Sequence, residues 1–124
     1  GLLAPNKCIY FPPWHFGAVL CVNTETGMVE RLVPQISGRE KYRAEGVLAP
    51  NNCIYFAPWD ADRVLCVNTD TSTASFMGPE IVGGRKYLAA GVLGPNNCIY
   101  FAPHDASHVL CINTDTGTVE MIGP

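Results

Sequence analysis

Apolar residues in this sequence gather in short blocks that turn-forming residues separate. Between residues 46 and 78 the blocks are "GVLA", "CIYFA", "RVLCVN" and "TASFMG". They are rich in β-branched and aromatic residues, and "PNN", Pro58 and "TDTS" interrupt them. This pattern predicts four short β-strands joined by turns. No segment has apolar residues at helical spacing over several turns, so we expect almost no helix.

The two middle blocks, "CIYFA" and "RVLCVN", are apolar at nearly every position. A strand with one face in water would alternate between apolar and polar residues. These strands are therefore expected to lie in a sheet that is covered on both faces.

The four blocks occur three times, and equivalent residues are 45 positions apart. Aligned glycines and cysteines show the period: Gly1, Gly46 and Gly91; Cys8, Cys53 and Cys98. Such a period is the signature of a repeat architecture. The sequence thus predicts three units, of which the first two include a connector: 1–45, 46–90 and 91–124.

Units of four antiparallel strands that their neighbours cover on both sides are typical of β-propeller blades. We therefore expect an all-β fold of three four-stranded antiparallel blades, with a stacked β-solenoid or a β-sandwich as alternatives. Three blades do not close a ring, since propellers have about four to eight, and an open arc exposes two apolar faces. Either a second copy of the chain completes a six-bladed ring, or further blades belong to a longer chain.

The repeat resembles the blades of NHL-type and YVTN-type β-propellers. The likeness lies in "GVLAPNNCIYFAP" and in "RVLCVNTDT": a glycine opens the first strand, a turn precedes the "IY" strand, and a "V-L-x-V" strand runs into a tight turn. It extends over all three units apart from the connectors. The Asp that usually closes the third strand is replaced by Asn23, Asn68 and Asn113. The resemblance implies a propeller and no particular activity, because this fold serves many functions.

Each unit carries two cysteines at fixed positions. The pairs are Cys8 and Cys21, Cys53 and Cys66, and Cys98 and Cys111. A hairpin centred between Trp14 and His15 would place Cys8 opposite Cys21, within reach of a disulfide. One interpretation is a disulfide in every blade, which would indicate an extracellular or other oxidising compartment. The other is that cysteine fills space between blades as a small apolar residue.

Composition narrows the classes of partner. The chain has 124 residues, 48% of them hydrophobic, which is typical of one globular domain. A net charge of -3 disfavours nucleic acid, whose phosphates require a basic face. No apolar run approaches the length of a membrane span, and the first residues, "GLLAPNKC", lack the regions of a signal peptide. The compartment stays open.

Polar and aromatic residues are predicted to gather on one rim of the arc. In an up-and-down blade, the loop between the second and third strands shares a rim with the connector to the next blade. From these loops we expect there Trp14, His15, Trp59, Asp60, Asp62, Arg63, His104, Asp105 and His108. The connectors add Arg39, Lys41, Tyr42, Arg85, Lys86 and Tyr87.

Aromatic rings beside carboxylates and amides suit sugars. The candidate ligand-binding residues are Trp14, His15, Trp59, Asp60, Arg63, His104, Asp105, Tyr42 and Tyr87. Both tryptophans are expected to be partly exposed. The alternative is that they cap the blade edges and that the charges are solvated.

Three functions remain open. The leading expectation is a non-enzymatic binding or scaffold module whose partner is another copy of the chain or neighbouring blades. The second is a multivalent lectin that binds glycans on the rim, and the third is a hydrolase or lyase of the six-bladed type. Nucleophile motifs, Cys-x-x-Cys pairs and phosphate-binding glycine loops do not occur, so no cofactor or metal is expected.

Overall fold

The part of the chain that the structure describes folds into twelve strands and contains no helix. This computed structural model describes residues 1–14, 16–32, 34–36, 38 and 40–123. The first unit holds β1 (Leu2–Leu3), β2 (Cys8–Phe11), β3 (Val19–Asn23) and β4 (Val29–Leu32). The second holds β5 (Val47–Leu48), β6 (Cys53–Phe56), β7 (Val64–Asn68) and β8 (Thr73–Met77). The third holds β9 (Val92–Leu93), β10 (Cys98–Phe101), β11 (Val109–Asn113) and β12 (Thr118–Ile122).

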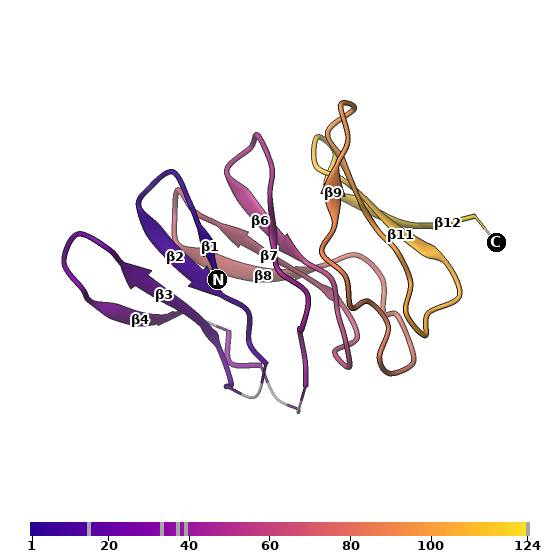
Figure 1. The fold of residues 1–124 in the computed structure, drawn as a ribbon, viewed down its shortest axis with the longest axis horizontal. Helices are drawn as coiled ribbons and strands as arrows, with labels where there is room; N and C mark the ends of the chain where they lie inside the picture. Colours follow the sequence, from indigo (N-terminus) through magenta and orange to yellow (C-terminus); the bar gives the residue numbers. More distant parts are fainter. Residues whose placement is uncertain (15, 33, 37, 39, 124) are drawn as a thin grey trace.

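Each unit forms its own four-stranded antiparallel sheet, in the strand order of the sequence. The three sheets stand side by side in chain order (Figure 1). This arrangement confirms the predicted fold of three antiparallel blades. The unit limits 1–45, 46–90 and 91–124 stay predictions, although each sheet lies within one of them. No described segment forms a helix long and apolar enough to cross a membrane.

The register of the second and third strands differs from the one that the cysteine spacing suggested. Cys8 pairs with Asn23, and Cys21 pairs with Tyr10. The hairpin is centred one position later than predicted, and this moves the partner of Cys8 by two residues. A shift of two keeps both thiols on one face of the sheet but places them diagonally, where the Cα atoms of a strand pair are about 7–8 Å apart, beyond disulfide reach.

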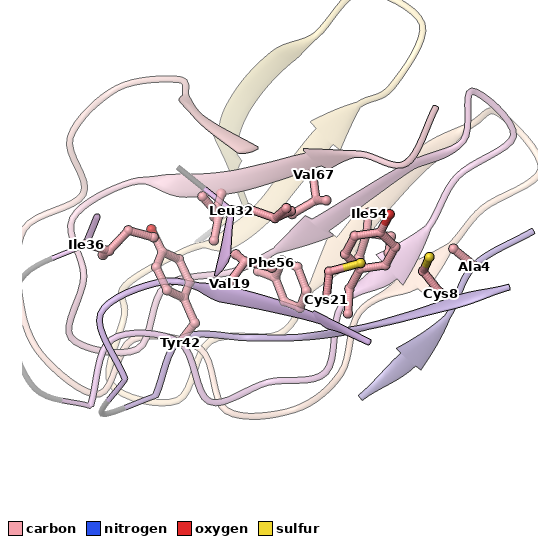
Figure 2. Close-up of a cluster of buried hydrophobic side chains, with 12 residues drawn as sticks. Ala4, Cys8, Val19, Cys21, Leu32, Ile36, Tyr42, Ile54, Phe56 and Val67 are labelled. Atoms are coloured by element: carbon pink, nitrogen blue, oxygen red, sulfur yellow. The ribbon is translucent and has the colours of Figure 1, made fainter. Parts of the chain in front are cut away.

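All six cysteines are free thiols, so the predicted disulfides are absent. They are Cys8, Cys21, Cys53, Cys66, Cys98 and Cys111. Cys8 and Cys21 point from the first sheet into the cluster of buried side chains shared with the second (Figure 2). The second interpretation from the sequence, a small apolar filler between blades, describes this position.

Most of the buried hydrophobic side chains that the structure describes lie in two clusters, one at each junction between neighbouring sheets. At the first junction, Val19 and Cys21 of blade one meet Ile54 and Phe56 of blade two (Figure 2). The second cluster joins the other face of blade two to blade three. The middle sheet is therefore covered on both faces, which explains why its central strands are apolar at nearly every position.

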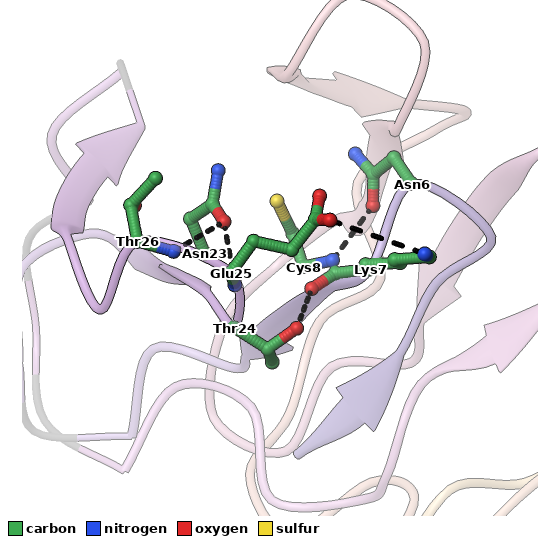
Figure 3. A network of polar contacts seen from close by, with 7 residues as sticks. All are labelled: Asn6, Lys7, Cys8, Asn23, Thr24, Glu25 and Thr26. Carbon is green, nitrogen blue, oxygen red and sulfur yellow. Dashed lines mark hydrogen bonds and ion pairs between the residues drawn. The ribbon is translucent and has the colours of Figure 1, made fainter.

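Asparagine side chains close the turns at the rim opposite the connectors. The Asn23 Oδ1 atom accepts hydrogen bonds from the backbone N–H groups of Glu25 (2.9 Å) and Thr26 (3.2 Å) (Figure 3). The Thr24 hydroxyl donates to the Lys7 carbonyl at 2.6 Å and ties this turn to the one before β2. The Asn23 side chain therefore closes this turn by accepting backbone hydrogen bonds.

Candidate functional site

The connectors thread between the loops that join the second and third strands. The Lys41 backbone N–H donates to the Trp14 carbonyl at 3.2 Å, and the Trp59 N–H donates to the Lys41 carbonyl at 2.9 Å. The next junction repeats this pattern: Lys86 N–H donates to the Trp59 carbonyl and His104 N–H to the Lys86 carbonyl. Each connector thus fixes the loop of one blade against the loop of the next.

This threading brings aromatic rings and a guanidinium group together on the rim. The Trp59 and His104 rings have centroids 5.2 Å apart and are tilted by 47°. The Arg43 guanidinium lies 5.6 Å from the Trp14 ring centroid and 5.3 Å from that of Trp59, within cation–π range. The structure thus brings together three residues that the sequence placed on this rim, Trp14, Trp59 and His104. Arg43 lies among them and was missed by the sequence reasoning.

Trp59 differs from its predicted state. Only 5% of its surface is exposed, whereas Trp14 is half-buried. The expectation that both indoles are partly exposed was thus wrong for Trp59, because the His104 ring and the Arg43 guanidinium lie against it. Its remaining surface contributes to a cavity.

A cavity of about 310 Å³ opens between the loops of blades two and three. Its lining is Glu40, Arg43, Trp59, Arg85, Leu88 and His104. Arg43 and Leu88 each precede the first strand of a blade by four residues, so the cavity lies where the connectors enter β5 and β9. Two guanidinium groups against the one carboxylate of Glu40 leave this lining with an excess of positive charge, which favours a ligand that carries negative charge or a polarised carbonyl.

His104 lies beside an acidic neighbour. Its Nδ1 atom lies 3.2 Å from the Asp105 Oδ1 atom, and both side chains are exposed. In the tautomer that carries its proton on Nδ1, the Nε2 atom keeps a lone pair and can act as a base.

Several other predicted site residues make structural contacts. The Asp60 Oδ1 atom accepts the Arg85 backbone N–H at 2.9 Å, and the Arg63 carbonyl accepts the Tyr42 hydroxyl at 2.6 Å. The Tyr87 hydroxyl donates to the His108 carbonyl at 3.0 Å. Burial raises the pKa of both tyrosines. A ligand-binding role for these residues stays a prediction, and His15 lies outside the described part of the chain.

Two lysines that the sequence placed on the open rim are buried. Only 2% of Lys41 and 1% of Lys86 is exposed. Their Nζ atoms donate to the carbonyls of Gly38 (2.7 Å) and Gly83 (2.5 Å). Burial lowers the pKa of both amines. Their identical spacing from the glycines was the one sequence signal of this role. Among the residues that the structure describes, no three His, Cys, Asp or Glu side chains converge as metal ligands would.

Comparison with known proteins identifies the fold. No family model and no curated protein matches the sequence. Among solved structures, the chain resembles a catalytically inactive virginiamycin B lyase from Staphylococcus aureus, crystallised with quinupristin, with a TM-score of 0.74 at 14% identity. It also resembles a streptogramin B lyase with a TM-score of 0.74 at 18% identity. The matches cover 99% of this chain but 40% and 39% of those chains.

These neighbours correct the leading functional expectation. They are β-propellers, and both are enzymes. The expectation of a non-enzymatic binding or scaffold module was wrong: it rested on the uniformity of the repeats, and uniform strands do not prevent the loops from differing between blades. His104 illustrates this, because the equivalent residues in the other two units are Trp14 and Trp59.

Proposed function

We propose that this chain supplies blades of a propeller enzyme that cleaves its substrate as a lyase does, by elimination. One observation carries the proposal: an imidazole with a carboxylate 3.2 Å from its Nδ1 atom lines a cavity together with two guanidinium groups. The two lyases of similar fold support it. The chain spans about two fifths of their length, so residues from other blades would complete the site.

The proposed reaction begins with proton removal. The His104 Nε2 atom takes a proton from a carbon next to a substrate carbonyl, while Asp105 stabilises the imidazolium that forms. The electron pair of the broken C–H bond develops charge on the carbonyl oxygen. The guanidinium groups of Arg43 and Arg85 stabilise that charge.

Bond cleavage completes the elimination. The electron pair returns to form a carbon–carbon double bond, and the bond from the adjacent carbon to the leaving oxygen or nitrogen breaks. The imidazolium then gives its proton to the leaving atom, which restores neutral His104. No water is consumed, so the products together have the mass of the substrate. Hydrolysis, in contrast, adds the mass of one water.

The test compares two histidines. The purified chain is incubated with virginiamycin B and with quinupristin, and mass spectrometry follows the products. His104→Ala is expected to lower kcat by about 10²–10⁴-fold. His108→Ala is the matched control, because the His108 Nδ1 atom contacts the Gly123 carbonyl and its ring does not line the cavity. Its activity should equal that of the unchanged chain.

Three outcomes would contradict the proposal: no turnover of either compound, products that carry an added water, or full activity of His104→Ala. Arg43→Ala and Arg85→Ala extend the test. Each should lower kcat/KM, whereas Arg31→Ala, at a residue of β4 outside the cavity lining, should not.

The relation of the blades to the NHL or YVTN type is a further proposal. The glycine, the "IY" strand and the "V-L-x-V" strand support it. A family model built from homologues of this chain would test it, and failure of that model to match either type would reject it.

A further inference from the structure

The outer face of blade one consists of apolar residues whose equivalents in the other two blades are fully buried. At the internal junctions these residues are Ile54, Phe56, Leu65 and Val67, and Ile99, Phe101, Leu110 and Ile112. The equivalent residues of blade one, here called the leading face, are Ile9, Phe11, Leu20 and Val22. Three of them are half-buried, and Phe11 is 38% exposed, although Phe56 and Phe101 are completely covered. The leading face is thus a junction face without its partner.

The outer face of blade three has the complementary composition. We call Cys98, Tyr100, Val109 and Cys111 the trailing face. Its counterparts in blade one, such as Tyr10 and Val19, are completely covered by blade two, whereas Tyr100 and Val109 are half-buried. A cavity of about 150 Å³ lies on this face beside Cys98 and Cys111. In the two internal junctions a trailing face packs against a leading face.

A hydrogen bond that crosses each internal junction is open at the third blade. The Asn6 Nδ2 atom donates to the Thr69 carbonyl of blade two at 2.9 Å. The Asn51 Nδ2 atom donates to the Thr114 carbonyl of blade three at 3.2 Å. Asn96 is the equivalent residue of blade three, and the repeat assigns it the carbonyl of residue 24.

Thr24 is exposed, whereas Thr69 and Thr114, its equivalents at the internal junctions, are 3% and 7% exposed. Thr24 and the leading face are thus both more exposed than the equivalent residues of blades two and three.

We propose that a second copy of this chain docks its leading face on the trailing face. In the resulting contact, the Asn96 side chain donates to the Thr24 backbone carbonyl of the other copy. Both faces belong to the same chain and already fit one another twice within it, which makes a second copy the partner of matching shape and chemistry. Two copies related by a two-fold axis satisfy both pairs of faces and close a ring, whereas a contact of this kind that does not close would produce filaments.

The first test is mass in solution. Light scattering and sedimentation of the 124-residue chain, over a range of concentrations, are expected to give twice the 13.4 kDa of one chain. Phe11→Glu places a charge on the leading face and should give the mass of a single chain that still melts cooperatively. Phe16→Glu is the matched control, because Phe16 is also exposed but lies outside both faces, and it should keep the doubled mass.

A mixing experiment separates docking from misfolding. Tyr100→Glu damages the trailing face, so this variant alone should also have the mass of one chain. An equimolar mixture with Phe11→Glu should recover the doubled mass, since the intact trailing face of one variant meets the intact leading face of the other. A misfolded variant would not recover.

The asparagines supply a second matched pair. Asn96→Ala should raise the dissociation constant of the dimer by about tenfold or more, since one hydrogen bond is lost at each of two contacts. Asn51→Ala removes the same bond inside the chain and should lower the melting temperature at every concentration without changing the mass.

A single-chain mass at all concentrations, a threefold mass, a mass that grows without limit, or a mixture that stays at one chain would each overturn the proposal.

Discussion

Phe11 and Phe56 occupy the same position in neighbouring blades, yet their surroundings differ. Phe56 is enclosed between blades one and two, whereas Phe11 is 38% exposed on the leading face. Their own strands have identical sequences, "CIYF". The difference therefore comes entirely from what lies beyond the blade. The middle blade is therefore stabilised by packing on both of its faces, whereas each outer blade has one face available for another contact.

Removal of the phenylalanine ring should destabilise the middle blade more than blade one. Phe56→Ala should lower the free energy of unfolding by about 3–4 kcal/mol, because it opens a cavity in a closed junction. Phe11→Ala should lower it by less, about 1–2 kcal/mol when the chain is dilute, since 38% of the Phe11 surface is already exposed. Urea unfolding at low protein concentration measures both. Equal losses would show that the two faces do not differ.

The buried cysteine thiols should make the folding stability of the chain depend on pH. Burial raises the pKa of the Cys21 thiol to about 11 and that of Cys66, in the middle blade, to about 12. Both values exceed that of an unfolded thiol, so the folded state holds these protons more tightly. The stability that this gives is complete below about pH 9 and is lost as the pH rises through 11 and 12.

The measurement is the urea midpoint between pH 8 and 12. The midpoint should fall above about pH 9, and Cys66→Ala should fall less steeply than the unchanged chain. A pH-independent midpoint, or an identical slope in Cys66→Ala, would contradict the assignment. At pH 8 both thiols should also react more slowly with iodoacetamide than an exposed cysteine does, because little thiolate is present.

The smallest effect concerns one turn. Ser72 has a positive φ of 53°, whereas the equivalent turns have glycine, with φ of 75° at Gly27 and 73° at Gly117. Ser72→Gly relieves an unfavourable backbone conformation but removes the 3.2 Å contact between the Tyr10 and Ser72 hydroxyls across the first junction. These effects oppose one another, so the melting temperature should change little. A drop as large as that of Asn51→Ala would show that the hydroxyl contact dominates.

Much of the fold could be predicted from the sequence because the repeat presents each strand three times. The uninterrupted apolar blocks predicted a sheet that is buried on both faces. The middle sheet is buried in this way, since blades one and three pack against its two faces. The hairpin register could not be predicted, because the loop between β2 and β3 contains several turn-forming residues and its centre depends on the connector that crosses it. That one-position difference removed the direct pairing of Cys8 with Cys21.

The site was only partly predictable for a similar reason. The loop residues Trp59 and His104 could be placed on one rim from topology alone. The burial of Trp59 could not, since it depends on Arg43 from the preceding connector. The sequence suggested that Lys41 and Lys86 are solvated charges. In the structure both are buried, and their ammonium groups donate hydrogen bonds to backbone carbonyls. Contacts between segments distant in sequence decided each of these cases.

Because the three hairpins are nearly identical in sequence, strands of different blades could pair with one another during folding. Strand β6 could pair with β11 as well as with β7, since "VLCIN" and "VLCVN" offer almost the same side chains. Loop entropy separates the two pairings. The native hairpin closes over residues 57–63, whereas the wrong one closes over residues 57–108, about three doublings in length. At about 0.6 kcal/mol per doubling, the native pairing is favoured by about 2 kcal/mol. Correct folding of this chain thus depends on short loops more than on side-chain identity, and lengthening the loop after Phe56 should increase strand exchange between blades.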